Sequence, residues 1–364
     1  MEVSAEEMNA AADIADELKL AICQAKNNIE RFHHDQLQDS ETIETMPGVM
    51  CWRKNVAIER VGLYIPGGTA PLFSTLLMLG IPAMLAGCKE IILCSPPAAD
   101  GRLHPAILYV AQLIGIKKIF KVGGVQAIAA MAYGTATIPG VYKIFGPGNQ
   151  YVTCAKQLVQ KEGVAIDMPA GPSEVAVYAD QSAIPAFVAA DLLSQAEHGT
   201  DSQSLLVTVS RSIIDSVLAE IDKQVINLPR AEIIKKALEN SAAILVKDEE
   251  EAIHLLNAYA PEHLILACAN AKTLAANVIN AGSVFLGHYS PESVGDYASG
   301  TNHTLPTNGY ARSYSGVSMD SFVKKITFQQ LTKEGLKNIG KTVISMAEAE
   351  GLQAHAEAVR VRLV

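Results

Sequence analysis

Two pairs of polar residues in this 364-residue chain are of the types that bind metals or transfer protons. Gln195 and His198 are three positions apart near the end of a predicted helix that Gly199 terminates, so both side chains lie on one face. Glu262 and His263 directly precede an apolar run, at the edge of a predicted strand, where a catalytic group is held rigidly. A histidine, with an unperturbed pKa of about 6.5, exchanges protons near neutral pH. Alone, Gln195 and His198 are more typical of a hydrogen-bonded helix end, and Glu262 and His263 are as typical of a surface pair as of a catalytic one.

Two further side chains add possible ligands. Asp296 lies in a Gly- and Ser-containing segment, and His355 lies in a predicted terminal helix. A turn residue and a surface histidine would give the same pattern, so neither is informative alone. Together with Gln195 and His198 they form a nitrogen and oxygen ligand set without thiolates, which suits zinc.

Glycine turns follow several predicted strands. The turn 146–149 (Gly-Pro-Gly-Asn) lies between a strand and a helix, and Asp167 follows about 20 residues later, which partly mimics a dinucleotide-binding fingerprint. Tyr151 stands where the third glycine would be. The pairs at 67–68 and 123–124 also end strands. We expect these three turns to gather at the carboxyl edge of one sheet, where open α/β folds bind ligands.

The elements that must position these residues alternate between strands and helices. Apolar runs rich in β-branched residues predict strands over 61–65, 90–94, 118–122 and 142–145, and helical patterns follow over 72–85, 105–113, 125–133 and 151–160. This alternation indicates a parallel sheet covered on both faces. After a loop over 167–173 the pattern restarts, with strands near 175–178, 205–209, 243–246, 264–267 and 283–286. The sequence therefore predicts an α/β protein with two lobes.

The remaining segments are less regular. Ser4 and Glu7 form a capping box ahead of a helical pattern that runs toward His34. Segment 287–315 reads as a long functional loop, and beyond 317 the chain reads as a short strand followed by helices. Segment 61–88 has no charge and imitates a membrane span, but its prolines and glycines predict a strand, a loop and a short buried helix instead.

Composition narrows the class of protein. With 29 Lys and Arg against 38 Asp and Glu, the net charge is −9, which argues against nucleic-acid and membrane-surface binding and favours small polar substrates. A hydrophobic content of 49% predicts a globular protein, and about 150 residues per domain predicts two or three domains. The six cysteines include no C-x-x-C pair and read as reduced thiols. The acidic N-terminus does not resemble a signal peptide, so we expect a cytoplasmic protein.

Six segments, in order and at similar spacing, resemble the histidinol dehydrogenase family. The similarity runs from about residue 3 to the C-terminus. The segments are Val61-Gly-Leu-Tyr-Ile-Pro-Gly-Gly68, Ile144-Phe-Gly-Pro-Gly-Asn149, Asp167-Met-Pro-Ala-Gly-Pro-Ser-Glu174, Asp191-Leu-Leu-Ser-Gln-Ala-Glu-His-Gly199, Pro261-Glu-His263 and Gly295-Asp-Tyr-Ala-Ser-Gly-Thr-Asn-His303.

The resemblance implies roles at the matching positions. Zinc ligands, one ion per subunit, would be Gln195, His198, Asp296 and His355. Proton acceptors would be Glu262 and His263, NAD contacts Tyr64, Gln126 and Asn149, and substrate contacts Ser173 and Glu350, joined by His263 and the zinc ligands.

The resemblance also implies the architecture. The fold would be α/β, with two incomplete, Rossmann-like lobes similar to those of aldehyde dehydrogenases and a C-terminal helical tail. Residues 1–63 and 174–316 would form the lobe with most of the metal and catalytic site, 64–173 the NAD-binding lobe, and 317–364 a tail exchanged between subunits. The homodimer would be intertwined, with Glu350 and His355 completing the neighbour's site.

The implied reaction is the last step of histidine biosynthesis. L-Histidinol would be oxidised to L-histidine through L-histidinaldehyde, with two hydrides transferred to two NAD⁺. Family members begin with additional residues before the position of Met1, yet every matched position is present, so we expect activity.

Three alternatives remain open at this point. A zinc hydrolase would use the same ligands to hold a water, with Glu262 as base and no need of NAD⁺. A catalytically silent zinc-binding protein would bind metal without producing NADH. Within a dehydrogenase, a thiohemiacetal route would need a cysteine near the sheet edge, where Cys88, Cys94 and Cys154 are expected. Manganese would suit the same ligands as zinc.

Overall fold

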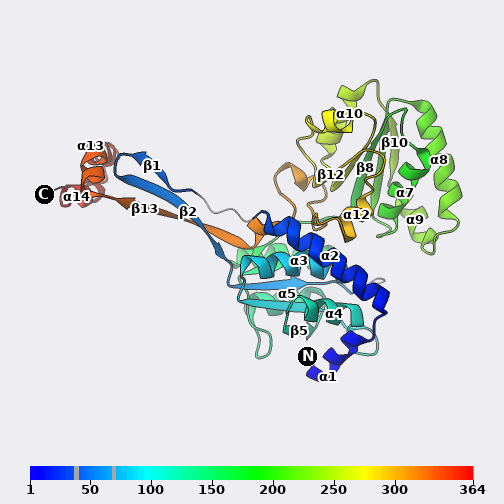
Figure 1. Cartoon of the computed structure of the whole chain (residues 1–364), viewed down its shortest axis with the longest axis horizontal. Helices are drawn as coiled ribbons and strands as arrows, with labels where there is room; N and C mark the ends of the chain where they lie inside the picture. Colours follow the sequence, from blue (N-terminus) through cyan, green and yellow to red (C-terminus); the bar gives the residue numbers. More distant parts are fainter. Residues whose placement is uncertain (37–40, 68–70, 364) are drawn as a thin grey trace.

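Two α/β lobes and a long arm make up the structure (Figure 1), a computed structural model that describes residues 1–36, 41–67 and 71–363. Each lobe contains a five-stranded sheet, and the arm contains a three-stranded sheet with two helices at its tip. The arm projects away from both lobes and ends at the C-terminus.

The N-terminal lobe is built on a parallel sheet with the strand order β5-β4-β3-β6-β7. Its strands are β3 (Arg60–Tyr64), β4 (Glu90–Ser95), β5 (Lys118–Lys121), β6 (Lys143–Phe145) and β7 (Ala165–Ile166). Its helices are α3 (Phe73–Ala86), α4 (Pro105–Leu113), α5 (Gly124–Tyr133) and α6 (Gln150–Lys161). The strands β4 and β5 lie on one side of β3, and β6 and β7 lie on its other side. The strand order therefore reverses between β3 and β6, and this topological switch point lies at the carboxyl ends of these two strands.

The C-terminal lobe repeats this order, as β10-β9-β8-β11-β12. Its strands are β8 (Glu174–Ala179), β9 (Gln203–Thr208), β10 (Ala242–Leu245), β11 (His263–Ala267) and β12 (Ser283–Leu286). Its helices are α7 (Pro185–Ala196), α8 (Arg211–Val225), α9 (Ala231–Leu238), α10 (Glu249–Tyr259), α11 (Ala271–Ala275) and α12 (Glu292–Tyr297). The predicted strands of both lobes are confirmed to within two residues, and most of them are buried apolar runs.

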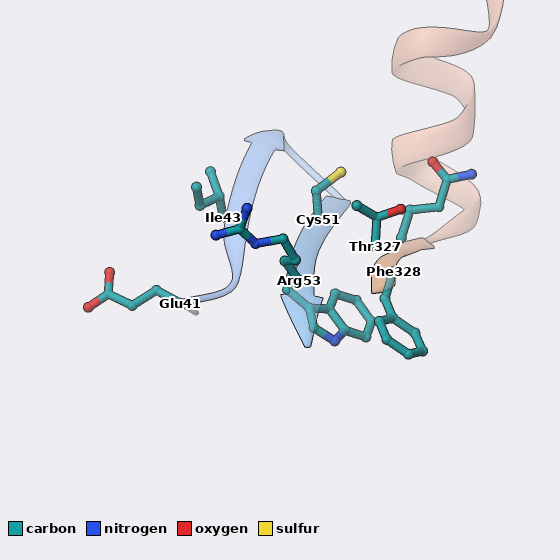
Figure 2. Close-up of a pocket in the computed structure, with 8 residues that line it drawn as sticks. Glu41, Ile43, Cys51, Arg53, Thr327 and Phe328 are labelled. Atoms are coloured by element: carbon teal, nitrogen blue, oxygen red, sulfur yellow. The ribbon is translucent and has the colours of Figure 1, made fainter. Parts of the chain in front are cut away.

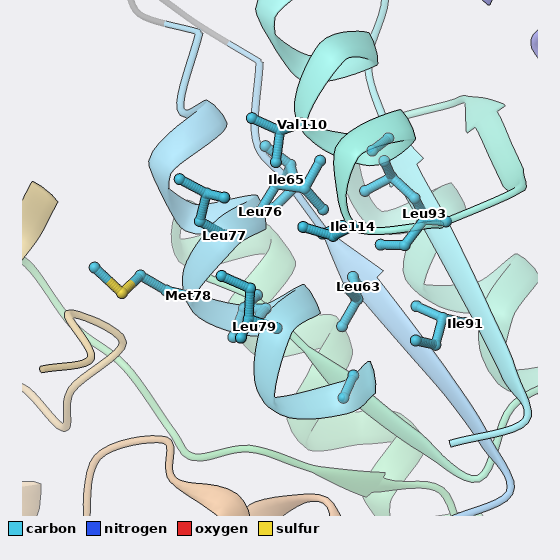
Figure 3. Packing of buried hydrophobic residues seen from close by; sticks show 14 of the residues in the cluster. Leu63, Ile65, Leu76, Leu77, Met78, Leu79, Ile91, Leu93, Val110 and Ile114 are labelled. Carbon is cyan, nitrogen blue, oxygen red and sulfur yellow. The ribbon is translucent and has the colours of Figure 1, made fainter. Parts of the chain in front are cut away.

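The charge-free segment 61–88 is confirmed as strand β3 followed by the buried helix α3. Leu76, Leu79 and the strand residue Leu63 have no exposed surface, and they pack with α4 in the core of the lobe (Figure 3). Helix α3 ends at Gly87, whose left-handed conformation (φ +83°) caps the helix. No helix in the described ranges is long and apolar enough to cross a membrane.

The N-terminal helices belong to a different lobe from the one expected. The Ser4–Glu7 capping box is confirmed, but it opens only the short α1 (Ala5–Met8); a 3₁₀ turn (Asn9–Ala12) precedes the long α2 (Asp16–His34). Ile22 and Ile29 of α2 are buried in the core of the N-terminal lobe, against α3. The assignment of residues 1–63 to the lobe of 174–316 is therefore wrong, and β3 also pairs within the N-terminal lobe.

The arm contains the strand and the helices expected beyond residue 317, together with two strands from residues 43–57 that were not predicted. It consists of β1 (Ile43–Met46), β2 (Val49–Ala57), β13 (Val323–Leu331), α13 (Lys333–Ala349) and α14 (Gln353–Arg360). β2 pairs antiparallel with the whole of β13 and with β1 on its other edge. Most of β13 is exposed, and the ring of Phe328 (39% exposed) stacks on Trp52 beside a groove that also contains Ile43 (Figure 2). A strand with little burial has no apolar alternation to identify it.

The segment 287–315 is also more ordered than the predicted loop. It contains α12, which carries Asp296, and a 3₁₀ turn (Tyr310–Arg312). A second 3₁₀ turn (Met319–Ser321) leads to Phe322, which returns the chain to the N-terminal lobe. The segment was predicted to be a loop because it is rich in glycine and serine. Its helix α12 is only six residues long, which is too short to show a helical pattern of apolar residues.

We expect Phe322→Ala to lower the free energy of unfolding by about 3–5 kcal/mol. The Phe322 ring has no exposed surface and stacks on Phe145 at a centroid distance of 4.1 Å, so its removal leaves a cavity where the arm joins the lobe. Urea denaturation followed by circular dichroism measures the change. Phe187→Ala, at a ring that is 42% exposed, is the matched control and should cost less than about 1 kcal/mol. Equal losses in the two variants would contradict this assignment.

Candidate active site

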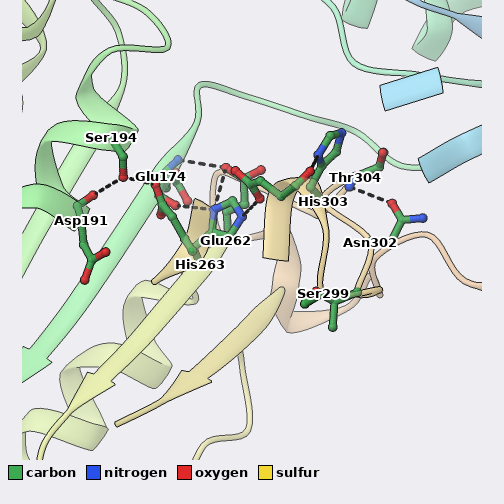
Figure 4. Close-up of polar contacts among 12 residues, drawn as sticks. Glu174, Asp191, Ser194, Glu262, His263, Ser299, Asn302, His303 and Thr304 are labelled. Atoms are coloured by element: carbon green, nitrogen blue, oxygen red, sulfur yellow. Dashed lines mark hydrogen bonds and ion pairs between the residues drawn. The ribbon is translucent and has the colours of Figure 1, made fainter. Parts of the chain in front are cut away.

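A cluster of acidic side chains and one imidazole lies at the amino edge of the C-terminal lobe's sheet (Figure 4). We call it the site cluster: Glu174, Glu262, His263, Glu292 and Asp296. Glu174 and His263 are the first residues of β8 and β11, which are neighbouring parallel strands. Because parallel neighbours start at the same edge, the sheet brings these two residues together from positions far apart in the sequence.

Backbone hydrogen bonds orient Glu262. The amide of Glu174 donates to its Oε2 at 3.0 Å. Burial raises the pKa of Glu262 to about 7, and the charge of His263 only partly opposes this shift. A carboxyl group with a pKa near neutrality serves well as a general base or acid.

His263 lies between three carboxyl groups. Its Nδ1 is 3.4 Å from the carbonyl oxygen of Glu174 and 3.8 Å from Oε2 of Glu262, and its Nε2 is 3.2 Å from Oδ1 of Asp296. Burial alone would lower the pKa of His263, but the charges of Glu262, Asp296 and Glu292 raise it to about 10. These two facing atoms, Nε2 of His263 and Oδ1 of Asp296, contact each other and have no other hydrogen-bond partner among the described residues.

Asp296 also faces two other histidines. Burial would raise its pKa, but its contact with His263 and the nearby His303 and His198 hold the pKa below its usual value. His198 follows the end of α7 and keeps a solvent-exposed surface. The structure therefore brings His198, His263 and Asp296 to one place, as the resemblance implied.

Gln195 enters the same cluster from the last turn of α7, where it is buried. With its amide oriented to suit its neighbours, its side-chain nitrogen donates to both carboxyl oxygens of Glu292, and its oxygen accepts from the amide of Glu174, all at 3.2 Å. Ser194 also donates to Oε1 of Glu292, at 2.7 Å. Burial raises the pKa of Glu292 to about 8, which favours its protonated form at neutral pH.

A loop from α12 connects the site cluster to the N-terminal lobe. His303 has its Nδ1 2.8 Å from the carbonyl oxygen of Asp296 and its Nε2 3.1 Å from the hydroxyl of Thr75 on α3. The side-chain amide of Asn302 donates to the carbonyl oxygen of Met78, also on α3, at 2.6 Å. The site cluster therefore lies where the two lobes meet.

Sequence reasoning missed Glu174, Glu292 and His303 as parts of the site. Glu174 and His303 are the last residues of two of the motifs that carry the family resemblance, which was a usable signal. Glu292 lies just outside these motifs, and only its burial, 1% exposed, distinguishes it from a surface carboxylate. The predicted substrate contact Ser173 is half-buried directly before Glu174.

The predicted cofactor contacts lie at the carboxyl edge of the other sheet. Tyr64 ends β3 and its hydroxyl accepts from the amide of Gly124, at 3.1 Å, two residues before the exposed Gln126. Asn149 caps α6, with its Oδ1 accepting from the amides of Tyr151 and Val152 at 3.1 Å each.

The three glycine turns gather at this edge. A side chain on Gly67 or on Gly123 would overlap the ring of Pro96, and one on Gly146 would overlap the carbonyl oxygen of Tyr64. Gly68 lies outside the described residues. The gathering of these turns is therefore confirmed, at the switch point of the sheet.

Two predicted site residues are far from this place within one chain. Glu350 follows α13 and His355 lies on α14, both exposed at the tip of the arm (Figure 1). Accordingly, no group of three or more His, Cys, Asp or Glu side chains within residues 1–36, 41–67 and 71–363 of a single chain comes together to hold a metal.

The thiols do not form part of the site. Burial raises the pKa of Cys88 and of Cys94 to about 12, which opposes formation of a thiolate nucleophile at neutral pH. Cys154 is exposed on α6. The surroundings of Cys88 and Cys94 therefore argue against a covalent thiohemiacetal route through either of these thiols.

Comparison with known proteins places the chain among close relatives. The family model for histidinol dehydrogenase matches residues 1–363. Histidinol dehydrogenases from Bacteroides fragilis (strain YCH46) and Bacteroides thetaiotaomicron are each 64% identical, covering 99% of this chain and 84% and 85% of their own lengths. The crystal structure of histidinol dehydrogenase from Elizabethkingia anophelis, 60% identical, covers 100% of this chain and 84% of that one, with a TM-score of 0.98.

A more distant likeness concerns the fold alone. An acetylating aldehyde dehydrogenase from Geobacillus thermoglucosidasius aligns with a TM-score of 0.56 at 18% identity, over 88% of this chain and 89% of that one. The predicted α/β fold, similar to that of aldehyde dehydrogenases, is confirmed.

Proposed function

Since this chain belongs to the histidinol dehydrogenase family and is an NAD-dependent oxidoreductase of histidine biosynthesis, we propose how its residues oxidise L-histidinol to L-histidine. The observation that carries the proposal is the buried pair Glu262–His263, which faces Asp296 at the junction of the lobes. Hydride transfer requires a base beside the substrate hydroxyl and a nicotinamide beside its carbon, and this junction adjoins both sheet edges.

In the first half-reaction, His263 in its neutral form, which the positive charge of the cation proposed below would favour, accepts the hydroxyl proton at Nε2 while the carbon loses a hydride to NAD⁺. The products are L-histidinaldehyde, NADH and one proton. Nε2 is the suitable atom, because Nδ1 faces the carbonyl oxygen of Glu174. General-base catalysis of this kind typically contributes about 10²–10⁴-fold.

In the second half-reaction, Glu262 activates a water that adds to the aldehyde. Its raised pKa, near 7, and its orientation by the amide of Glu174 suit this role. The resulting diol gives up a hydroxyl proton to His263 and a hydride to a second NAD⁺, and the carboxylic acid so formed releases a further proton to give the carboxylate. One carboxylate base, Glu262, and one imidazole base, His263, thus serve the two oxidations without a covalent cysteine intermediate.

We propose that Gln195, His198 and Asp296 hold one zinc ion, with His355 from a second copy of the chain. The nitrogen and oxygen donors fit zinc, and Oδ1 of Asp296 is buried with Nε2 of His263, at 3.2 Å, as its one polar contact among the described residues. When bound, zinc supplies positions for the imidazole and amino nitrogens of the substrate and a positive charge that opposes protonation of His263. Orientation of the reacting C–H bond lowers the activation barrier by several kcal/mol, out of the roughly 7–11 kcal/mol that ideal proximity and orientation can supply.

We propose that Tyr64, Gln126 and Asn149 contact NAD⁺ at the switch point of the N-terminal lobe. The glycine turns there let the backbone approach the dinucleotide closely. Ser173, beside Glu174, and Glu350 of the second copy would contact the substrate.

The arm supports an intertwined homodimer. β13 is mostly exposed, and Ile326 and Phe328 on it, like Met346 on α13 and Val361 directly after α14, have about 40–60% exposed surface. Such a surface is stabilised by burial against another chain, and a swapped arm brings His355 and Glu350 to the partner's site. We also propose a cytoplasmic location, which suits the six free thiols.

Two molecules of NADH should form per molecule of L-histidinol consumed. Absorbance of NADH measures the stoichiometry, and preincubation with a chelator should abolish turnover until zinc is restored. A zinc hydrolase or a silent zinc protein produces no NADH, and a simple alcohol dehydrogenase produces one equivalent. Any of these results would reject the proposed function.

We expect His263→Asn to abolish turnover, a loss of about 10²–10⁴-fold or more, while zinc content stays near one per chain. Asparagine fills a similar volume but cannot accept a proton at neutral pH. The exposed His254 on α10 provides the matched control, His254→Asn, which should turn over normally. Normal turnover in His263→Asn would reject its role as base.

Mixing two inactive variants should restore activity if the sites are shared. His355→Ala should lose zinc, and a hybrid dimer with His263→Asn has one site with both residues intact. Refolding an equal mixture should give about a quarter of wild-type activity, since half of the dimers are hybrids with one intact site each. Gln353→Ala, exposed on the same helix, is the control for His355→Ala. Inactive, verified hybrid dimers would contradict the swapped arm.

A further inference from the structure

A buried ion pair lies beneath the glycine turn that follows β6. Lys156 on α6 pairs with Asp167, which follows β7, and their side chains are 5% and 1% exposed. In the sequence, Asp167 stands where a dinucleotide fingerprint would place an acid for the ribose. The structure excludes that role, because the carboxylate is saturated by protein groups: Lys156 and the amides of Gly146 and Met168, both amides at 2.8 Å.

The pair holds both backbone groups of one glycine. The amide of Gly146 donates to Oδ2 of Asp167, and its carbonyl oxygen accepts from Nζ of Lys156, each at 2.8 Å. Gly146 has φ +127° and lies against the carbonyl oxygen of Tyr64. The ion pair therefore sets the orientation of the peptide groups on both sides of a residue that has unusual backbone freedom.

Stability alone does not account for this pair. A buried ion pair offers little net stability over well-packed apolar side chains, because both charges lose their hydration. Its specific effect is on geometry, since an apolar pair would bury the same volume and leave the amide and the carbonyl of Gly146 unheld. The turn leads directly to Asn149 and adjoins Tyr64, two of the proposed NAD contacts.

We propose that Lys156 and Asp167 are positioning residues for NAD⁺: they hold the turn 145–147 in the orientation that lets the dinucleotide bind at the junction of β3 and β6. This inference rests on the NAD site proposed above. It adds that the cofactor site is preformed by a charge pair that never touches the cofactor.

Asp167→Asn and Lys156→Met test the pair. We expect the dissociation constant of NADH, measured by fluorescence, and the KM for NAD⁺ to rise about tenfold or more, while the KM for L-histidinol changes by less than about twofold. Lys118→Met is the matched control, because Lys118 pairs with Glu90 at the opposite, amino edge of the same sheet. A pair that only stabilised the fold would lower the melting temperature without separating the two KM values.

A double variant, Lys156→Met with Asp167→Leu, keeps the test decisive if a single variant does not fold. The apolar pair should restore the melting temperature, yet NADH binding should stay weak. A double variant that binds NADH as tightly as wild type would overturn the inference. Absence of NADH binding by the wild-type enzyme would instead reject the cofactor site itself, so the two failures are distinguishable.

Hydrogen exchange of the wild-type enzyme gives an independent measurement. The amide of Gly146 should exchange slowly before any nucleotide is added, and NADH should not slow it further by more than about twofold, because the hydrogen bond to Asp167 already exists. Protection that appears only on addition of NADH would show that the cofactor, not the ion pair, orders the turn, and would overturn the inference.

Discussion

The burial of several carboxyl groups around His263 is the constraint on which the rest of the structure depends. Removing charges from water is costly unless they are paired, and Glu262, Glu292 and Asp296 all act on the same imidazole. Protein groups partly replace the lost hydration. A backbone amide donates to Glu262, the side chains of a serine and a glutamine donate to Glu292, and histidines lie beside Asp296. Asp296 keeps its negative charge, because its pKa is held below the usual value, and this charge is the physical basis for the proposed zinc site.

The two lobes have the same strand order but use opposite edges of their sheets. The N-terminal lobe presents the carboxyl ends of β3 and β6, where backbone turns approach one another closely. The C-terminal lobe presents the amino ends of β8 and β11, where Glu174 and His263 begin the strands. The closely approaching backbone turns of the N-terminal lobe suit the binding of a nucleotide. Proton transfer needs titratable side chains, and these lie at the edge of the C-terminal lobe. The contacts of Asn302 and His303 with α3 fix one edge relative to the other.

The sequence predicted the buried parts of the fold well and the exposed parts poorly. The helix 105–113 has the bounds that were predicted, and the fully buried β11 lies within one residue of its predicted bounds, because apolar composition reports burial within one chain. β2 and β13 carry polar residues on exposed positions, so their pairing left no periodic signal. In the site, residue types suggested a nitrogen and oxygen ligand set, but only the family resemblance connected Gln195 with Asp296. Neither source revealed that Glu292 is buried beside Gln195, since burial of a carboxyl group depends on tertiary packing.

The same limit explains why Asp167 misled the fingerprint comparison. An acid about 20 residues after a glycine turn is informative only when its carboxylate reaches the ligand, and here a lysine one helix away takes it instead. Sequence spacing records the distance between turn and acid but not the partner of the acid. In the NAD⁺ site that we propose, the glycine turn still faces the ligand, with the amide of Gly146 held by that acid and Gly146 lying against the carbonyl oxygen of Tyr64. A glycine turn followed by an acid, the pattern of the dinucleotide-binding fingerprint, can therefore lie at the same edge of a parallel sheet in this protein. Here, however, the acid binds the backbone of the turn and not a ribose.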